Sequence, residues 1–427
     1  MRRAAVAATL VAVALFLALA THTKQGGWND ASRLAMIEAI VEHGHLWIDG
    51  TYMSRFTGDI CRIDGKFYSD KPPALAFAGV PVYAVETALG ITFRTDLPRA
   101  YYWTTLIVIG GTTIAGLVVL ALFLRRIVPD PWWRAATVLA VGLGTLNTAY
   151  TVTFSNHPPS AMALLVGFLL LWRWRRFDGG LASVAGSALM TGLSALTDHG
   201  AAFYFPAFLA YLLWPGAPRR REAALVFIGA AALPILGYMA YATALSGSPL
   251  PLPLQPRLFD YPGSYFADHG HLAGSALTHG SLVELLRYVG LCLIGYRGLF
   301  IHTPTMLFVV WGAFRIAASP GRPHRAEAIV ALVPTLVLVT YYLLTSTDPG
   351  GNAYGVRWFC LFMPILYVFM ADGYAELRSL AARVLFWVAY ALSFPLAWIG
   401  AWDPWLDPTP YGTSFSWVIV LRAHGLM

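Results

Sequence analysis

Residues Tyr101–Leu124 read YYWTTLIVIGGTTIAGLVVLALFL, and the basic pair Arg125-Arg126 follows directly. The stretch holds no charged side chain, and a helix of about 20 apolar residues is long enough to cross the hydrocarbon core of a bilayer. Because Lys and Arg concentrate in cytoplasmic loops, the stretch predicts a membrane span whose carboxyl end lies inside the cell.

The same pattern recurs along the whole chain. Of its 427 residues 57% are hydrophobic and 12% are charged, with a mean hydropathy of +0.59, whereas soluble domains carry about 25% charged residues. With every basic cluster placed inside, the predicted spans are Ala4–Ala20, Tyr101–Leu124, Ala135–Phe154, Ser160–Trp172, Leu181–Leu196, Ala201–Trp214, Ala223–Leu245, Phe300–Phe314, Ile329–Leu344, Trp358–Met370 and Val384–Ala401. The sequence therefore predicts an all-α polytopic membrane protein of about eleven transmembrane helices, one integral membrane domain over residues 1–427, in a bacterial plasma membrane.

The distribution of charge argues against a nucleic-acid partner. The formal net charge is +7, but the Arg residues form short groups between apolar stretches and do not line one face. The three cysteines, Cys61, Cys292 and Cys360, have no metal-ligand or disulfide spacing. We expect them to pack as small apolar residues.

Three apolar segments allow more than one interpretation. Ala4–Ala20 follows two Arg residues, so it is either a cleaved signal peptide or a retained first span; we favour retention, and both place residue 30 outside the cytoplasm. If Ala74–Leu89 crossed the membrane, Arg125-Arg126 would lie outside. We therefore expect it to lie in or dip into the outer interface, and we treat Leu282–Leu299 in the same way.

Two outer loops are long, residues 21–99 and 246–283, and both are rich in aromatic residues. Long loops in compact proteins usually carry function, so we expect the working face to be the outer one. In the second loop His269 and His271 follow Asp268. This group would either bind a metal or form a polar loop that lines an acceptor site.

The first outer loop begins with Asn29 and Asp30. Asn is a favoured N-cap, and the following apolar residues recur every three or four positions, which predicts a short amphipathic helix on the membrane with Arg33, Glu38 and Glu42 on another face. The helix dipole favours an ionised Asp30. Its carboxylate would act either as a capping group or as a general base toward a hydroxyl.

A β-hairpin is predicted further along this loop. Residues Ile60–Ser69 form two short segments around Asp64-Gly65, a preferred two-residue hairpin turn. The hairpin leads into Asp70-Lys71-Pro72-Pro73, where the prolines restrict the backbone. Lys71 would therefore be fixed at headgroup depth, where its ammonium either snorkels to the interface or binds a lipid phosphate.

The two motifs Asp30-Ala31-Ser32-Arg33 and Asp70-Lys71-Pro72-Pro73, in this order on one outer loop, resemble the motifs of GT-C membrane glycosyltransferases. The resemblance is greatest to the protein mannosyltransferase and aminoarabinose transferase branch, whose usual patterns are Asp-Glu-x-Arg and acidic-Lys-Pro-Pro. It covers residues 1 to about 250 in architecture. It implies a GT-C-like bundle and a transferase that takes a sugar from a polyprenyl-phosphate donor on the non-cytoplasmic face.

The resemblance also implies roles for individual residues. Asp30 takes the position of the family's catalytic base, and Lys71 that of the lysine facing the lipid phosphate. Ala31 is a departure, since relatives often hold Glu there. Two further outer turns also depart: Asn156-His157 stands where relatives often place an acid, and Thr197-Asp198-His199-Gly200 stands where they often show Thr-Lys-Gly. The residues to which we assign a substrate-orienting role are Arg33, Asp70, Asn156, His157, Asp198 and His199.

A departing lipid phosphate needs positive charge. Lys71 is one candidate, and Arg357 is another, because Arg binds phosphate bidentately and the glycines of the preceding segment, Gly350–Val356, permit close backbone approach. We also assign Tyr354 to donor-phosphate binding. The alternative for Arg357 is a side chain that only snorkels to the interface.

The expected partners are a polyprenyl-phosphate-linked sugar, an acceptor hydroxyl on a glycan, lipid or protein, and membrane lipid. No obligatory cofactor or metal is expected, although a divalent metal is possible. Three alternatives stay open. They are a secondary transporter, whose ionisable residues would usually lie near the bilayer midplane, a catalytically inactive GT-C-like assembly subunit, and a lipid-linked glycan ligase or polymerase.

Overall fold

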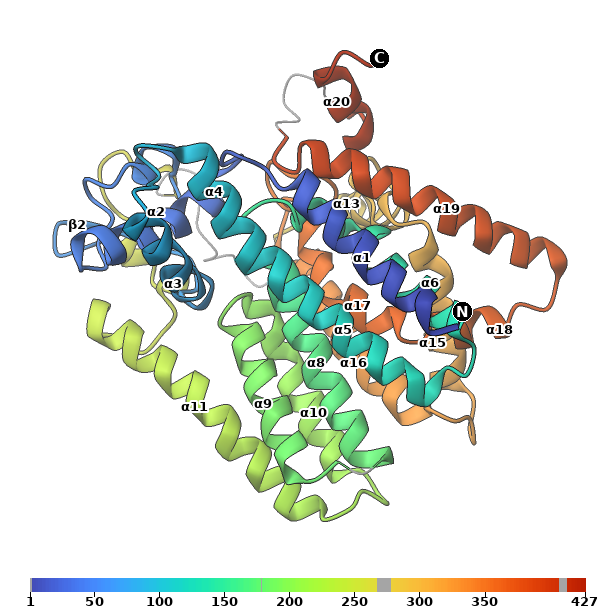
Figure 1. Ribbon diagram of the computed structural model, residues 1–427. Helices are drawn as coiled ribbons and strands as arrows, with labels where there is room; N and C mark the ends of the chain where they lie inside the picture. The colour runs from blue at the N-terminus through green and yellow to red at the C-terminus, as the bar shows by residue number, and fades with distance from the viewer. Residues whose placement is uncertain (1, 178, 267–277, 407–412) are drawn as a thin grey trace.

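The computed structural model describes residues 2–177, 179–266, 278–406 and 413–427, and its regular structure is almost entirely helical (Figure 1). Labels with η mark short 3₁₀ or π segments. The first half contains α1 (Arg2–Ala20), α2 (Trp28–His43), η1 (Met53–Phe56), β1 (Ile60–Ile63), β2 (Lys66–Ser69), α3 (Ala74–Ala88), α4 (Leu97–Thr105), η2 (Leu106–Gly110), α5 (Gly111–Ile127), α6 (Pro131–Leu143), α7 (Leu146–Tyr150), α8 (His157–Arg176), α9 (Leu181–Ala195), η3 (His199–Phe203) and α10 (Tyr204–Leu213). The second half contains α11 (Arg220–Ser246), η4 (Leu252–Leu254), η5 (Pro256–Leu258), α13 (Leu282–Leu293), α14 (Leu299–His302), α15 (Thr305–Ala318), α16 (Arg325–Thr345), η6 (Arg357–Phe362), α17 (Met363–Tyr367), α18 (Met370–Ala375), α19 (Leu380–Trp402) and α20 (Ser416–Ala423).

The helices agree with the predicted spans. Four helical segments of the described chain are long and apolar enough to cross a membrane: Leu97–Ile127, which joins α4, η2 and α5, and the helices α11, α16 and α19. Shorter apolar helices include α1, α9 and α15. Each predicted span coincides with one helix or with consecutive helices, so the prediction of an all-α, multi-pass membrane protein is confirmed.

Small residues let these helices approach closely, as is common between helices in membranes. A Cβ atom on Gly312 of α15 would lie 2.3 Å from the Cα of Gly373 in α18. A Cβ on Gly142 of α6 would lie 2.8 Å from the side chain of Val13 in α1, and Val13 itself is completely buried. Helix α1 is therefore packed into the bundle as an integral part of it.

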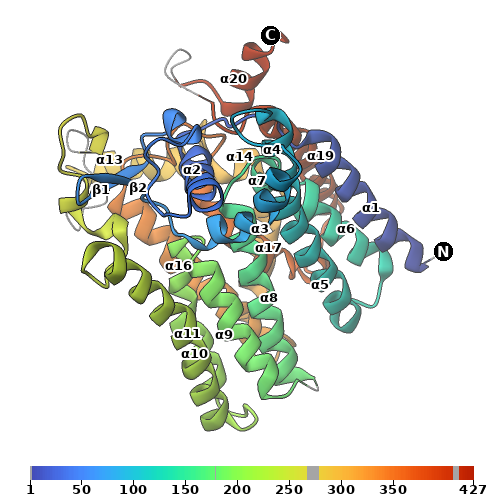
Figure 2. The same ribbon diagram turned by 60° about the vertical axis from the view of Figure 1, so that its left-hand side comes forward.

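The first outer loop forms a separate layer at one end of the bundle. Helices α2 and α3 and the hairpin lie together there, while the carboxyl ends of α8 and α10 lie at the opposite end (Figures 1 and 2). Strands β1 and β2 pair antiparallel with Ile63 opposite Lys66. Asp64 and Gly65 have φ angles of 49° and 82°, as a type I′ turn requires. The predicted hairpin is confirmed.

Helix α2 differs from its prediction in two ways. Its N-cap is Gly27, not Asn29, and Asp30 is the third residue of the helix. Its residues from Asp30 to Ala39 are all buried, so it is not an amphipathic helix resting on the membrane surface. The reason is tertiary: α3 packs against it so closely that a Cβ on Gly79 would lie 2.4 Å from the side chain of Ile37.

The two long outer loops pack on each other. Leu252, Leu258 and Phe259 of the second loop share an apolar cluster with Cys61 and Ile63 of β1. The segment predicted to lie in the interface, Leu282–Leu299, contains α13 and the turn that leads to α14. Asp268, His269 and His271 lie outside the described residues.

The opposite end of the bundle has its own polar contacts. The buried carboxylate of Glu327, at the start of α16, accepts hydrogen bonds from Arg176 Nε at 2.7 Å and from the Tyr211 hydroxyl at 2.6 Å. Nearby in sequence, His324 Nδ1 lies 3.4 Å from the carboxylate of Asp372. These contacts connect α8, α10, α16 and α18 far from the first outer loop.

Candidate active site

The two sequence motifs of the first outer loop are joined directly. The hydroxyl of Ser32, in the first motif, lies 2.7 Å from the hydroxyl of Ser69, which precedes the second motif. The ammonium of Lys71 lies 2.9 Å from the carboxylate of Asp59 and 3.2 Å from that of Asp70. Lys71 is therefore held in a fixed position next to α2.

Arg33 lies on the same helix turn and is almost completely buried. Its Nη1 donates to the carbonyl of Asn29 at 2.8 Å, while its Nε–H has no partner among the described residues. Burial lowers the pKa of Arg33 to about 10, although the carboxylates of Asp70 and Asp59 counteract this. The guanidinium is thus still charged at neutral pH, and a buried cation with an unused donor suits an anionic ligand.

The start of α8 is tied to the turn before η3. His157 Nδ1 lies 2.9 Å from the carboxylate of Asp198, and both side chains are almost buried. Asn156 Nδ2 donates to the carbonyl of Thr197 at 3.2 Å. Burial alone would raise the pKa of Asp198, but the hydrogen bond and the charge of His157 bring it below its usual value. His199 follows, and its buried Nε2 has no partner within the described part of the chain.

Arg357 is the first residue of η6. Its guanidinium carbon lies 5.0 Å from the ring centre of Trp405, within cation–π range, and its Nε has no hydrogen-bond partner among the residues described. Gly350 and Gly351 lie against this side chain with φ angles of 113° and 73°. Both the backbone conformation and the lack of space explain why glycine occupies these two positions.

These groups lie within electrostatic range of one another. Arg33 interacts with Asp59, Asp70, Asp198 and Arg357, and His157 interacts with both Arg33 and Arg357. His199 interacts with Asp198, Arg33 and Lys71. We call this set the charged cluster; its members are Arg33, Asp59, Asp70, Lys71, His157, Asp198, His199 and Arg357. They come from four separate parts of the sequence.

Two predicted site residues are engaged elsewhere. The carboxylate of Asp30 is completely buried and accepts hydrogen bonds from the N–H groups of Gly26, Gly27 and Ala31 and from the hydroxyls of Tyr101 and Thr153. Burial raises the pKa of Asp30, and the first four of these bonds partly offset the rise. The Tyr354 hydroxyl donates to the carbonyl of Leu396 at 2.6 Å. Both side chains therefore have structural partners that a substrate would have to displace.

An apolar groove of about 540 Å³ lies between η3, α10 and α16. Its walls are Ala202, Phe203, Pro206 and Ala207 from η3 and α10 and Val333, Pro334 and Val337 from α16. The short helix η3 that supplies Phe203 starts at His199, so one turn of chain connects the groove to the cluster. Both α10 and α16 coincide with predicted spans, and the groove therefore has the composition and the place to hold a hydrocarbon chain.

Comparison with known proteins gives a likeness of structure only. No protein-family model and no curated protein sequence matches the chain. The crystal structure of the Archaeoglobus fulgidus oligosaccharyltransferase tethered with an acceptor peptide matches with a TM-score of 0.57 and 13% identity, over 92% of this chain and 55% of that one. ArnT from Cupriavidus metallidurans bound to undecaprenyl phosphate matches with a TM-score of 0.55 and 14% identity, over 90% and 63%.

The apo state of the same ArnT matches over 98% of this chain and 76% of that one, with a TM-score of 0.53 and 13% identity. The chain has the GT-C fold. It spans about half the length of the archaeal oligosaccharyltransferase that it matches. The structural expectation drawn from the two sequence motifs is thereby confirmed, although the resemblance had been followed only to about residue 250.

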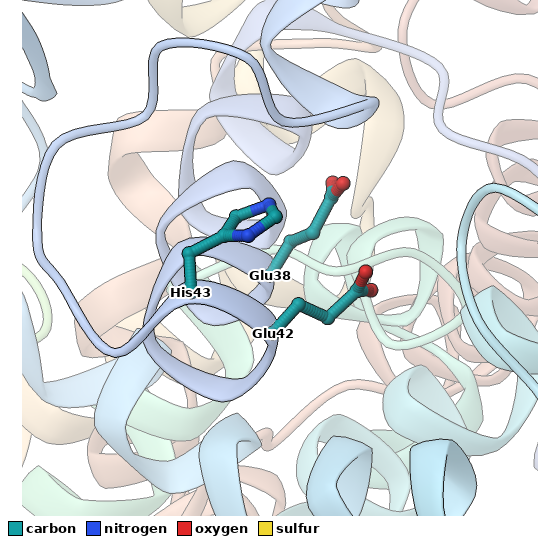
Figure 3. A group of neighbouring side chains, drawn as sticks. All are labelled: Glu38, Glu42 and His43. Atoms are coloured by element: carbon teal, nitrogen blue, oxygen red, sulfur yellow. The ribbon is translucent and has the colours of Figure 1, made fainter.

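Within this GT-C fold, one group of described residues brings metal-ligating side chains together. Glu38, Glu42 and His43 of α2 each offer one ligand atom, and these atoms lie within 4.8 Å of one another (Figure 3). Glu38, however, already accepts two backbone N–H groups at the start of η1, and Glu42 accepts the hydroxyl of Tyr83. A bound metal would have to replace these bonds, so the donor set fits a metal poorly.

Sequence reasoning missed Asp59 and Trp405, which contact Lys71 and Arg357. Asp59 lies just before the predicted hairpin, and this position was the only feature of the sequence that could have pointed to its contact with Lys71. Trp405 belongs to the segment after the last predicted span, to which the sequence analysis assigned no role. Asp59 and Lys71 meet because they flank the same hairpin, in which Ile60 pairs with Ser69, whereas Trp405 meets Arg357 only when parts of the chain far from each other in sequence come together.

Proposed function

We propose that the protein is a membrane glycosyltransferase that moves a sugar from a polyprenyl-phosphate carrier to an acceptor hydroxyl on the non-cytoplasmic face. One observation carries the proposal: Arg33, Lys71 and Arg357 come from distant parts of the chain into one charged cluster of a GT-C fold. Preorganised cations of this kind stabilise a phosphate as it departs. The ArnT structure bound to undecaprenyl phosphate supports the same class of donor.

The apolar groove supplies the place for the donor's lipid chain. In our proposal the phosphate lies at the charged cluster, and the polyprenyl tail runs from η3 between α10 and α16 into the bilayer. This arrangement buries hydrocarbon against apolar side chains and leaves the sugar on the side of the two long outer loops. The sugar, the phosphate and the lipid tail of the donor would therefore lie, in that order, at the two long outer loops, the charged cluster and the apolar groove.

The reaction would be a displacement at the anomeric carbon. The acceptor oxygen forms a bond to this carbon, the bond from the carbon to the phosphate oxygen breaks, and the lipid phosphate leaves with the electron pair. Lys71 is held by two carboxylates, whereas Arg33 and Arg357 retain unused Nε–H donors, so the guanidinium groups have the donors ready for the phosphate.

The acceptor and the base complete the proposal. Residues 252–266 of the second outer loop pack on the hairpin that precedes Lys71, and this part of the loop is our candidate for recognising the glycan, lipid or protein that carries the hydroxyl. The role of Asp30 as the general base stays a prediction. It would require the carboxylate to give up at least one of its five hydrogen bonds.

The test is binding of polyprenyl phosphate to the purified protein in detergent. Lys71→Ala and Arg357→Ala should each weaken this binding about tenfold or more, since each removes a charged hydrogen bond of about 1.5–3 kcal/mol. Lys66→Ala is the matched control, because Lys66 is an exposed lysine of the same outer loop. Equal binding by all three variants would refute the phosphate role.

Sugar transfer is then measured in membranes that supply acceptors, with polyprenyl-phosphate-linked hexoses and pentoses as donors. Transfer that requires Lys71 and Arg357 would support the proposal. No transfer from any of these donors would favour the inactive assembly subunit, and solute flux in proteoliposomes without acceptor would favour the transporter.

A further inference from the structure

The charged cluster contains an Asp–His pair that joins the start of α8 to the turn before η3. His157 Nδ1 lies 2.9 Å from Asp198 Oδ2, and the neighbouring bond from Asn156 to the carbonyl of Thr197 already ties the two segments together. A carboxylate only accepts hydrogen bonds, so Nδ1 carries the proton in the neutral ring. The lone pair of the imidazole is therefore on Nε2, where it can accept a proton.

We infer that His157, oriented by Asp198, is the general base that deprotonates the acceptor hydroxyl. This inference rests on the proposed sugar transfer and assigns its proton-accepting step. His157 is a member of the charged cluster and lies within electrostatic range of Arg33 from α2 and Arg357 from η6. The same side chain therefore lies near the two cations that we assign to the donor phosphate, as a base acting at the anomeric centre must.

The surroundings of the ring suit a base that has to take up and release one proton. Burial lowers the pKa of His157, the charges of Arg33 and Arg357 act in the same direction, and Asp198 opposes them through its hydrogen bond and its charge. The ring of Tyr150 from α7 lies edge-on to the imidazole, with the two ring centres 5.8 Å apart. The neutral imidazole is therefore the favoured form in the resting protein, which leaves Nε2 able to accept a proton, and Asp198 stabilises the imidazolium once it has formed.

Asp30 is less suited to this step in the same structure. Its two carboxylate oxygens share five hydrogen bonds, and the side chain has no exposed surface. Three of those donors are backbone N–H groups before and within the first turn of α2, and of these the N–H of Ala31 also contacts the carbonyl of Gly27. A proton placed on Asp30 would weaken the cap of the helix that carries Arg33. The bonding of His157 carries no such cost, because only its Nδ1 is engaged.

The step balances as follows. The proton of the acceptor hydroxyl moves to His157 Nε2 while the acceptor oxygen bonds to the anomeric carbon. The bond from the anomeric carbon to the phosphate oxygen breaks, and the lipid phosphate leaves with the electron pair. The imidazolium, stabilised by Asp198, then releases its proton to water. No oxidant, reductant or further reactant is consumed.

The experiment compares His157→Gln and Asp198→Asn with a matched pair at the opposite end of the bundle. His324→Gln and Asp372→Asn alter another His–Asp contact that lies outside the proposed machinery. His157→Gln should lower kcat about 100-fold to 10,000-fold, the usual contribution of a general base, with polyprenyl-phosphate binding and the thermal unfolding midpoint close to wild type. The two control variants should transfer sugar at the wild-type rate.

The pH profile separates catalysis from a structural role. In wild type, transfer should fall at low pH as the imidazole becomes protonated. Asp198→Asn should move this acidic limb to lower pH by about one unit or more, because removal of a neighbouring negative charge disfavours the imidazolium. In His157→Gln the fall of transfer at low pH should be absent, because the imidazole that causes it has been removed. If His157→Gln is too unstable to assay, the shift of the acidic limb in Asp198→Asn still distinguishes a catalytic role of His157 from a structural one.

The possible failures are distinguishable. If wild-type protein transfers sugar and His157→Gln stays within threefold of it, or if the acidic limb of Asp198→Asn coincides with that of wild type, this inference is overturned and the proposed function stands. If Asp30→Asn alone abolishes transfer while stably folded and His157→Gln does not, the base is Asp30. If wild type transfers from none of the donors, both proposals fail.

Discussion

The hydroxyl of Tyr101 donates a 2.9 Å hydrogen bond to the carboxylate of Asp30, and both side chains are completely buried. Tyr101 belongs to α4, at the start of the second predicted span, while Asp30 closes the first turn of α2. The Thr153 hydroxyl contacts both side chains and accepts the indole N–H of Trp405. This network fixes the first outer loop to the bundle, and through Trp405 it also reaches Arg357.

We expect Tyr101→Phe to lower the stability of the protein by about 1–3 kcal/mol, because a buried carboxylate loses one of its donors. Tyr102→Phe is the control: its hydroxyl donates to the carbonyl of Ala18, so its loss should cost about 0.5–1.5 kcal/mol. Thermal unfolding in one detergent compares the two. Equal midpoints would show that the Asp30 carboxylate does not depend on Tyr101.

Asp30→Asn tests the same network by changing the acceptor carboxylate instead of the donor hydroxyl. We expect a larger loss of stability than in Tyr101→Phe, since the substitution removes one acceptor oxygen and the charge that favours a helix N-terminus. The protein that remains folded should still transfer sugar. Loss of transfer at wild-type stability would instead support the role that the sequence motif assigns to Asp30.

The membrane architecture could be predicted from sequence because its cause is local. A run such as Tyr101–Leu124 must satisfy its own backbone in lipid and therefore forms a helix. The Asp64-Gly65 turn depends only on two residues that tolerate positive φ. The helices and the hairpin were therefore predicted correctly.

The interior of the outer layer could not be predicted in this way. Arg33 and Glu38 of α2 looked like an exposed polar face, but the loop folds around them, and each finds polar partners that are distant in sequence, such as the η1 amides for Glu38. The pairing of His157 with Asp198 joins residues that are separated by two spans. The sequence motifs named both residues but contained no information on the contact between them.

Filling the apolar groove should weaken binding of long donors. Ala207 lines the groove between α10 and α16, and Ala207→Trp would place an indole where we propose the polyprenyl chain lies. We expect KM to rise about tenfold for a donor with a long polyprenyl chain and to change little for a two-isoprene donor. Leu233→Trp on the exposed surface of α11 is the control. An equal effect on both donors would contradict this position for the tail.

Glu86 predicts a pH dependence of stability. Burial raises the pKa of Glu86 from 4.5 to about 7, although Thr104 donates a hydrogen bond of 3.0 Å to it. A raised carboxyl pKa favours the protonated form in the folded state, so its stabilising contribution is present below about pH 4.5 and is lost as the pH rises through about 7. Glu86→Gln mimics the protonated acid.

The unfolding midpoints of wild type and Glu86→Gln should therefore agree within about a degree at pH 5, and the variant should be higher by a few degrees at pH 8. Glu222→Gln is the control, because Glu222 is an exposed residue in an ion pair with Arg219 at the start of α11. A constant difference between Glu86→Gln and wild type at both pH values would show that Glu86 is ionised in the folded protein throughout this range.

Removal of divalent metal should leave sugar transfer within about twofold of its initial rate. The proposed leaving group is a lipid monophosphate, whose charge Lys71, Arg33 and Arg357 can stabilise without a metal. Glu38 and Glu42 are occupied by the η1 amides and Tyr83, so a metal bound with His43 would have to break those contacts (Figure 3). The measurement is transfer before and after dialysis against EDTA. If activity is lost and Mg²⁺, Mn²⁺ or Zn²⁺ restores it, and if Glu42→Gln or His43→Gln raises the metal concentration required, the group on α2 is a metal site, and transfer in this GT-C fold depends on it.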